Sequence, residues 1–279
     1  MSDAIIELRY MESTPNSLSG VQHVHDKSYE ILFVIEGEGS MLIGNNLYTV
    51  SPNTVFLTSK MEVHNIMPTS EHYVRNILNV SDEYIDKLAE LTSSSDYITE
   101  LFQRRCIRLS DDVASLIKTQ FSIIKSDAEA TVSNGISKLS NLINLFELLT
   151  TSESIGVTSI NSAVSDAVRY IDKNLSSALS LDEICDKVHL SKYHFIRIFR
   201  EKTGMSPFKY IIESRISKAK KLLTYTDESI SNIACSVVFS TSSNFCNLFQ
   251  KYEKISPTEF RRIHKKITDH IEKKNNRPY

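Results

Sequence analysis

The stretch SLDEICDKVHLSKYHFIRIFREKTGMSPFKY, residues 180–210, decides how the C-terminal half of this chain folds. A second stretch, SISNIACSVVFSTSSNFCNLFQKYEKISPTEF at residues 229–260, repeats its pattern of Ile, Phe and Ser-Pro positions. The offset is 49 residues before an internal turn and 50 after it. Self-similarity at a fixed period indicates that one supersecondary unit occurs twice. The nature of that unit therefore governs what the chain does.

The first copy carries the start and stop signals of two short helices. Ser180 followed three residues later by Glu183 is a capping box, which starts a helix. Gly204 is placed to end the second helix, because glycine readily adopts the left-handed conformation of a C-terminal cap. Two short helices joined by a tight turn form a helix-turn-helix. We predict one over 181–203 and another over 230–253.

The second helix of each predicted unit presents an outer face suited to DNA. In a helix-turn-helix, N-terminal side chains of this helix reach base edges in the major groove. Arg can bond a guanine edge with two donors, and Tyr or Ile can touch a thymine methyl group. Predicted base contacts are Tyr193, Ile196, Arg197, Ser242, Ser243, Asn244 and Asn247. Predicted phosphate contacts, which add affinity without reading sequence, are Ser191, Lys192, Arg200, Lys202, Ser240 and Lys251.

The segment between the two copies helps to distinguish DNA binding from its alternative. One copy alone would also fit a three-helix packing unit with a solvated basic face. The apolar spacing over 207–224 predicts a long helix of roughly 27 Å. This length is close to the roughly 34 Å between successive major-groove faces of B-DNA. Two copies at that separation favour DNA binding.

Charge and composition narrow the classes of function that this chain can have. Residues 1–164 contain 11 Lys and Arg against 21 Asp and Glu, whereas residues 165–279 contain 21 against 13. A basic half suggests that this part meets a polyanion. The chain lacks an apolar run of membrane-spanning length and a signal peptide, so we expect a cytoplasmic protein without a membrane partner. Its four cysteines show no CxxC pairing, and we expect buried thiols.

The N-terminal half changes period once. Residues 1–80 show short β-rich runs between turn residues, which favour a small barrel or sandwich, whereas residues 81–150 have helical periodicity. Residues 151–164 are small and polar, as in an interdomain linker. We therefore predict an α+β multidomain protein whose all-α DNA-binding domain occupies 165–279.

One apolar stripe in the helical region has two interpretations. Ile136, Leu139, Ile143 and Phe146 follow one another at spacings of 3, 4 and 3, and further Leu residues flank them. The stripe fits either a helix packed within its own domain or a coiled-coil-like contact between two chains. We predict a homodimer formed through these four residues.

The repeated segment resembles the AraC/XylS family of bacterial transcription regulators over about residues 165–266. The residues that carry the resemblance are Leu190 to Arg200, Thr203 to Pro207, Arg215, Ile216, Ala219, Lys220, Leu222, Leu223, Ile230, Ile233, Ala234, Ser256, Pro257, Phe260 and Arg261. It implies seven helices with two helix-turn-helix units reading adjacent major grooves. The chain departs from the family at Val238, where Gly is usual, and at Asn247 and Gln250, where Arg and Lys are common. A β-branched residue resists positive φ, so the second turn is expected to be strained or differently shaped.

The N-terminal region is similar to the cupin-like sensor domain of such regulators. His23, His25, Glu30 and His64 follow the order of a cupin metal site, which would suit a divalent transition metal. The family resemblance instead implies that these side chains satisfy one another at the mouth of the barrel or face an effector, and we predict no bound metal and no cofactor. A metal-dependent cupin enzyme fused to a DNA-binding module is the alternative from another class. A constitutive DNA-binding dimer without an effector is a third reading.

Taken together, the sequence predicts a sequence-specific DNA-binding transcription regulator and not an enzyme. Its partners would be double-stranded promoter DNA, a sugar-like or other small-molecule effector, RNA polymerase and a second copy of the chain. Activation is the output that the family resemblance implies. A ligand that changes dimer geometry would change promoter occupancy, because linking two DNA-binding modules raises their effective concentration.

Overall fold

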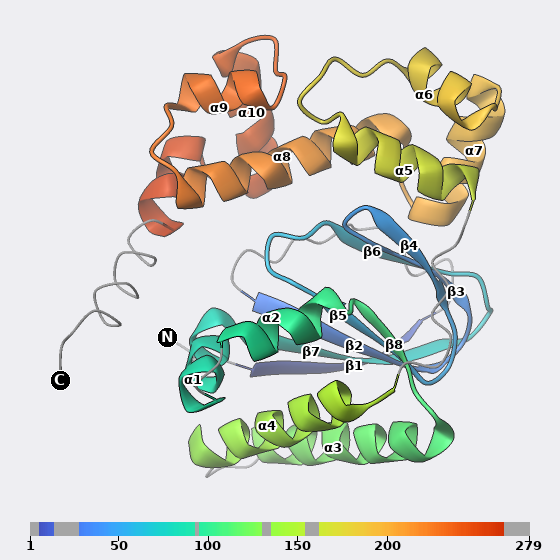
Figure 1. The fold of residues 1–279 in the computed structure, drawn as a ribbon, viewed down its shortest axis with the longest axis vertical. Coiled ribbons are helices and arrows are strands. Elements are labelled where there is room, and N and C mark those ends of the chain that lie inside the picture. The colour runs from blue at the N-terminus through green and yellow to red at the C-terminus, as the bar shows by residue number, and fades with distance from the viewer. Residues whose placement is uncertain (1–5, 14–27, 93–94, 130–134, 154–161, 265–279) are drawn as a thin grey trace. The chain divides into compact units, whose positions relative to one another are not determined.

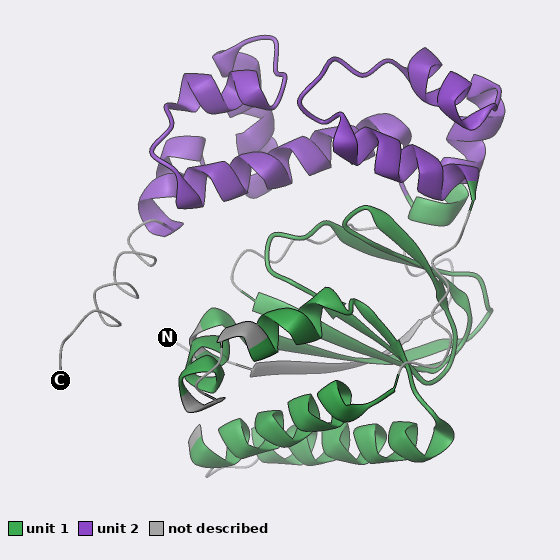
Figure 2. Cartoon of the chain, in the orientation of Figure 1, with its two compact units in different colours: residues 1–162, 201–204 green, residues 163–200, 205–279 purple. Residues whose placement is uncertain are grey.

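The computed structural model describes residues 6–13, 28–92, 95–129, 135–153 and 162–264. The chain forms two compact units, an N-terminal one of residues 1–162 with 201–204 and a C-terminal one of residues 163–200 with 205–279 (Figure 2). The predicted α+β class is confirmed, since the first unit is rich in strands and the second is helical. No helix in the described ranges is long and apolar enough to span a membrane.

The N-terminal unit is built on two antiparallel sheets (Figure 1). Its strands are β1 (Ile6–Ser13), β2 (Ser28–Glu36), β3 (Gly39–Ile43), β4 (Asn46–Val50), β5 (Thr54–Thr58), β6 (His64–Pro68), β7 (Tyr73–Ser81) and β8 (Cys106–Arg108). The larger sheet has the order β1-β7-β2-β5-β8, and the smaller has the order β4-β3-β6. Buried residues of both sheets, including Leu32, Met41 and Phe56, form one core between them.

Helices cover the other face of the larger sheet. They are α1 (Asp82–Thr92), α2 (Ser95–Gln103), α3 (Asp111–Glu129) and α4 (Gly135–Thr151). Alternation along β2 places Ile31 and Phe33 toward these helices and Leu32 and Val34 toward the smaller sheet. The sheet therefore separates a helix-packed core from an interior between the two sheets.

One strand lies outside the range expected for the barrel. β8 falls within 81–150, which the sequence assigns to helices, and its Ile107 pairs with Val55 of β5. A strand of three residues is too short to show a period of two in the sequence. The strands and the helices α1 to α4 consequently belong to one compact unit.

The apolar stripe of α4 packs mainly within its own unit. Phe146 is buried at 1% exposure in the core beneath the larger sheet, and Leu139 and Ile143 are partly buried against that core. Ile136 is 79% exposed. Including Phe146 in a dimer contact is therefore wrong, because its side chain already fills the core of its own chain.

The C-terminal unit contains the repeated helices. They are α5 (Ala163–Lys173), α6 (Leu181–Val188), α7 (Lys192–Thr203), α8 (Pro207–Tyr225), α9 (Ile230–Ser236) and α10 (Ser242–Glu253), and residues 257–264 are also helical. The last residues of α7, from Glu201, are grouped with the N-terminal unit. The predicted linker, 151–164, overlaps the ends of α4 and α5, and its residues 154–161 lie outside the described part of the chain.

Aromatic contacts show that the same core is built twice in the C-terminal unit. In the first helix-turn-helix, the ring of Phe199 lies 5.4 Å from that of Phe195 and 5.7 Å from that of Tyr210. In the second, Phe249 lies 5.5 Å from Phe245 and 5.4 Å from Phe260. Edge-to-face rings at these separations stabilise both cores beyond the burial of their area.

Candidate nucleic-acid interface and effector site

The first helix-turn-helix is set by local signals that the sequence contains. The Ser180 hydroxyl accepts a hydrogen bond from the Glu183 amide at 3.2 Å, and the Glu183 carboxylate accepts one from the Ser180 amide at 3.1 Å. His189 then adopts the left-handed conformation with φ 55° and ends α6. The predicted capping box is therefore present.

The outer face of α7 presents the predicted base-contacting side chains. Phe195 and Phe199 are fully buried, and this fixes which side of the helix faces away from the unit. On the other side, Tyr193 is 82% exposed and Ile196 is 39% exposed, with Arg197 exposed beside them. Large apolar side chains left in water next to a cationic one indicate a binding surface.

The predicted phosphate-contacting side chains surround this face. Ser191, Lys192, Arg200 and Lys202 are all exposed. The ammonium of Lys192 forms an ion pair, since its Nζ lies 2.5 Å from Oδ1 of Asp182 on α6. The hydrogen bond and the charge of Asp182 raise the pKa of Lys192.

The second helix-turn-helix presents a neutral face. Thr241 caps α10 by accepting the amide of Asn244 at 3.0 Å. Asn244 also donates to the Ser240 hydroxyl at 3.3 Å. Ser243 and Asn247 are exposed, and Ser242 is half-buried. Ser240 and Lys251 are likewise exposed, so Lys251 alone among these predicted contacts of the second helix-turn-helix carries a charge.

Val238 has the strained backbone conformation expected for this turn, and the second turn has the same shape as the first. Its φ of 57° lies in the left-handed region, next to the 55° of His189 in the first turn. The two turns also share their bonding: the amides of Val238 and Phe239 donate to Cys235 and Ala234 at 2.9 and 3.0 Å. Positive φ is a clear outlier for a β-branched residue, so the second turn is held in this conformation by its surroundings.

The N-terminal unit brings Glu30 and His64 together between its two sheets. Nε2 of His64 lies 3.5 Å from Oε1 of Glu30, and its Nδ1 lies 3.0 Å from the Glu62 carbonyl oxygen. Burial lowers the pKa of His64, but the charge and hydrogen bond of Glu30 together with Glu62 outweigh this, and the net pKa is raised. His23 and His25 lie outside the described residues. The described ranges contain no cluster of three or more metal-ligating side chains.

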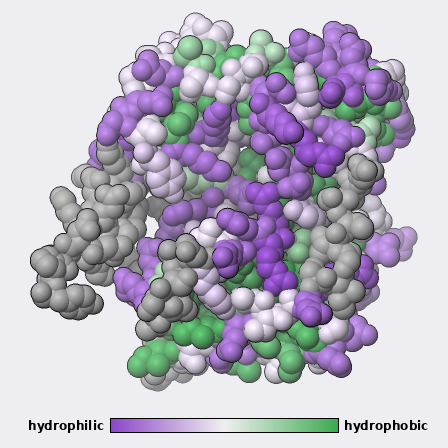
Figure 3. Space-filling view, viewed as in Figure 1, coloured by the Kyte–Doolittle hydropathy of each residue, from purple (hydrophilic) through white to green (hydrophobic). Residues whose placement is uncertain are grey.

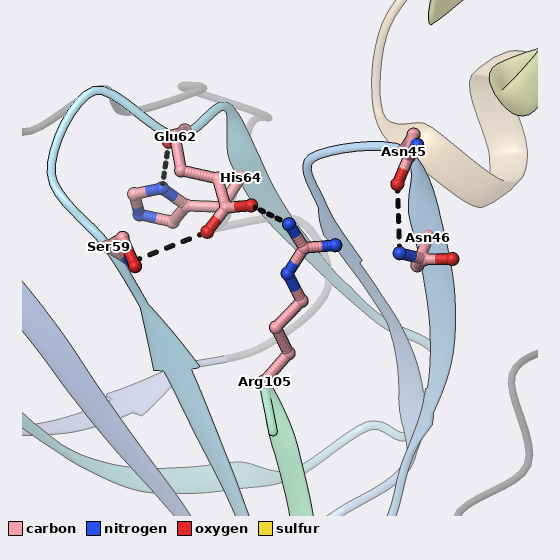
Figure 4. Close-up of polar contacts among 6 residues, drawn as sticks. All are labelled: Asn45, Asn46, Ser59, Glu62, His64 and Arg105. Carbon is pink, nitrogen blue, oxygen red and sulfur yellow. Dashed lines mark hydrogen bonds and ion pairs between the residues drawn. The ribbon is translucent and has the colours of Figure 1, made fainter. Parts of the chain in front are cut away.

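Arg105 and Glu62 form a neighbouring pair that sequence patterns did not indicate (Figure 4). Nη2 of Arg105 lies 2.7 Å from Oε1 of Glu62, and the other carboxylate oxygen accepts the Ser59 amide at 3.4 Å. Figure 4 shows the Asn45 and Asn46 side chains bonded to each other apart from this group. Arg105 precedes the short strand β8, and nothing in its local sequence marks it as part of a site.

A row of polar side chains crosses the larger sheet on its inner face. Glu30 is paired in register with Thr58 on one side and with Asn79 on the other. Alternation places all three on the side of Leu32, Phe56 and Ile77, between the sheets. The Thr58 hydroxyl and the side-chain amide oxygen Oδ1 of Asn79 are buried and have no hydrogen-bond partner among the described residues. Each such group costs about 1 to 3 kcal/mol, so the row fits a site that a ligand completes.

Comparisons with known protein families match both units. A model of the AraC-like ligand binding domain matches residues 8–146, and a model of a helix-turn-helix domain matches residues 184–263. The chain belongs to the AraC family of transcription regulators. The resemblance predicted from the repeated segment is thereby confirmed, and an AraC-family protein combines the ligand-binding type of domain with a DNA-binding one.

Individual AraC-family relatives align over different lengths. The uncharacterized HTH-type transcriptional regulator YfiF of Bacillus subtilis is 25% identical over 94% of this chain and 85% of its own. The HTH-type transcriptional activator RhaS of Enterobacter sp. is 24% identical over 86% of this chain and 87% of its own. The regulatory protein PocR of Salmonella typhimurium is 34% identical over 38% of this chain, and the match spans only about a third, 35%, of PocR.

Proposed function

We propose that this AraC-family protein activates transcription by binding promoter DNA through α7 and α10, under control of a small molecule held in its N-terminal unit. The observation that carries the DNA-binding part is the outer face of α7, where Tyr193, Ile196 and Arg197 stand exposed at the start of a recognition helix. Activation is supported by the name of its relative RhaS, an HTH-type transcriptional activator. An activator at a promoter acts in the cytoplasm with RNA polymerase as its partner.

A selection experiment tests the DNA-binding proposal. Purified chain is used to select duplexes from a random pool, and fluorescence anisotropy then compares a selected duplex with a scrambled one. We expect binding at least about 10³-fold tighter to the selected duplex at physiological salt. Equal binding to both would contradict sequence-specific recognition, because phosphate contacts alone do not distinguish sequences.

The polar row of Glu30, Thr58 and Asn79 supports a hydroxyl-bearing effector. A carboxylate and a free amide oxygen are acceptors, and the Thr58 hydroxyl accepts as well as donates. His64 lies against the same carboxylate. Arg75, on the same face of β7, adds buried N–H donors, so the site offers both acceptors and donors. A ligand with several hydroxyl groups pairs with both, because each hydroxyl donates and accepts. We therefore place a sugar-like effector first and other hydroxylated metabolites second.

A thermal-shift screen with sugars and polyols tests this site. A saturating ligand at 100 times its Kd stabilises the protein by about 2.7 kcal/mol. The Asn79→Ala variant should lose most of the shift. Asn76→Ala is the matched control, because Asn76 lies on the same strand and the alternation of β7 turns it to the opposite face. An equal loss in both variants would contradict the assignment.

The exposed apolar residues of α3 and α4 support dimerisation. Leu116 is 54% exposed and Ile123 is 45% exposed, and their separation of seven residues puts them on one face of α3. Ile136 of α4 is also exposed, and Figure 3 shows apolar side chains on the surface formed by these helices. We propose this surface as the homodimer contact, in place of the stripe that ends at Phe146.

Light scattering during size-exclusion chromatography tests the dimer. The double variant Leu116→Asn with Ile123→Asn should elute as a monomer at concentrations where the unchanged protein is a dimer. Lys125→Asn, a change of another exposed residue of α3, is the control and should remain dimeric. A double variant that stays dimeric would exclude this surface.

A further inference from the structure

Arg215 connects the two halves of the C-terminal unit. It lies midway along α8, and its guanidinium donates to three backbone carbonyl oxygens. Nε bonds Leu175 at 3.2 Å and Nη2 bonds Ser177 at 2.8 Å, both in the loop between α5 and α6. Nη1 bonds Val238 at 3.4 Å, in the turn between α9 and α10. Figure 1 shows this loop and this turn side by side next to the middle of α8.

The chemistry of the side chain makes this a stiff connection. A guanidinium is planar and holds its donors in a fixed fork, so three bonds to three carbonyls fix where those carbonyls lie. Arg215 is half-buried, and burial lowers its pKa from the usual value, yet an arginine stays charged in proteins. Its hydrogen bonds are therefore charge-assisted and stronger than those between neutral groups.

The position of the turn matters because α10 follows it directly. Val238 is three residues before the Thr241 cap of α10, so a shift of the Val238 carbonyl changes where α10 begins. α7 is joined to the start of α8 through Gly204 and the Ser206 cap. α8 itself spans roughly 28 Å, and each added base pair moves a DNA site by about 3.4 Å and turns it by about 35°.

We propose that Arg215 is a positioning residue that holds the two helix-turn-helix units at one separation. The protein would then select DNA sites by the spacing of two boxes, which are the short base sequences contacted by α7 and by α10. This inference rests on the proposed DNA-binding function. Arg215 touches no DNA itself in this proposal, and it acts by fixing the α9–α10 turn against the α5–α6 loop.

Lys218 provides a matched control on the same helix. Its Nζ donates to the Ser176 hydroxyl in the α5–α6 loop, so it holds the same loop as Arg215. That hydrogen bond stays within the first half of the unit. Removing Lys218 therefore loosens the loop without cutting the connection to the Val238 turn.

The test measures spacing selectivity with the full-length protein. Duplexes selected by the unchanged protein are rebuilt with one base pair removed, or with one or two added, between the two boxes, and one duplex keeps only the first box. The unchanged protein should prefer its selected spacing over the altered ones by tenfold or more. Arg215→Ala should reduce this preference to threefold or less, whereas Lys218→Ala should keep it. Binding to the single-box duplex should stay within twofold for all three proteins.

The outcomes separate this inference from the proposed function. If the unchanged protein binds no duplex selectively, the proposed function itself fails. If it binds selectively but Arg215→Ala keeps the full spacing preference, only the role of Arg215 is overturned. Equal loss by Arg215→Ala on single-box and two-box duplexes would also overturn it. Should Arg215→Ala not fold by circular dichroism, Arg215→Lys carries the test, because a compact ammonium lacks the planar fork that spaces the three hydrogen bonds and should reduce the preference too.

Discussion

The two helix-turn-helix units use the same backbone with different residues at its tightest points. In the first unit, His189 and Gly204 have φ values of 55° and 76°. In the second, Val238 and Lys254 occupy the corresponding positions with φ values of 57° and 66°. Only one of these four residues is glycine, which adopts this conformation without a steric penalty. The fold has thus been repeated in a sequence that fits the second turn less well than the first.

The two units also differ in what is buried around them. Lys220 is 1% exposed and Glu213 is 9% exposed on α8. The residues 49 positions earlier, on α5, are Ile171 and Val164, which are buried and apolar. The first helix-turn-helix thus combines an apolar supporting helix, α5, with a cationic and aromatic recognition face. The second helix-turn-helix has buried charges on its supporting helix, α8, and a mostly neutral recognition face. We therefore expect the first helix-turn-helix to anchor the protein on DNA and the second to adjust the fit.

The largest expected effect comes from the buried charge of the second unit. Nζ of Lys220 lies 2.8 Å from Oε2 of Glu253 and 5.5 Å from the centre of the Phe260 ring. Glu253→Ala leaves this ammonium buried without its carboxylate and should cost about 3 kcal/mol of stability in urea unfolding. The double variant Lys220→Met with Glu253→Gln should recover most of the loss. If the single variant costs less than about 1 kcal/mol, the typical value for an exposed pair, the ion pair does not hold α10 to α8.

The second-largest expected effect is the difference in DNA binding between the two recognition faces. Arg197→Ala should cost about 1 to 3 kcal/mol of binding to a selected duplex and relax the choice of one base. Asn247→Ala should cost less, because the second unit is expected to contribute less affinity. Lys202→Ala should weaken binding to all sequences alike. Anisotropy titrations on selected and scrambled duplexes measure all three, and a larger loss for Asn247→Ala would reverse the roles of the two units.

Backbone strain gives a smaller difference. Val238→Gly should stabilise the second helix-turn-helix by about 1 kcal/mol, because it removes a β-branched side chain from the left-handed region. His189→Gly should gain less, since its side chain is not branched at Cβ. Hydrogen exchange of peptides spanning 229–253 and 180–203 would report each gain separately. A slower exchange that is the same for both variants would show that branching carries no cost here.

The smallest expected effect is a dependence on pH. Burial raises the pKa of Glu213, although Lys209, whose Nζ lies 3.6 Å away, acts to lower it. The folded state therefore binds this proton more tightly than the unfolded state, and ionisation costs stability at pH values above the folded pKa. Glu213→Gln should raise the melting temperature at pH 7, and this gain should shrink as the pH falls through the folded pKa toward 4. A gain independent of pH would assign the effect to packing.

The helix-turn-helix units were predictable because their information is local. The Ser180 capping box, the Phe195 and Phe199 spacing and the Ser206-Pro207 start each specify a helix end or a buried face within a few residues. The strain at Val238 was visible in the same way, since a single side chain conflicts with a known turn conformation.

Features that depend on distant pairing were not predictable. Arg105 meets Glu62 only because β8 pairs with β5, and Thr58 and Asn79 flank Glu30 only through strand register. A helical period likewise identifies an apolar face without saying what covers it. Phe146 is covered by its own chain and Ile136 is left exposed, although both belong to the same apolar stripe.

In the ion pair between Lys192 and Asp182, the carboxylate offsets one positive charge of the proposed DNA-binding surface. A phosphate that approaches α7 competes with the Asp182 carboxylate for the ammonium of Lys192. Each phosphate neutralised on B-DNA contributes about −0.9 to the slope of log K against log salt concentration. Lys192 should therefore contribute little to that slope on random DNA, where the protein is loosely held. Its charge becomes available chiefly at sites where the helix docks closely enough for a phosphate to take the place of Asp182.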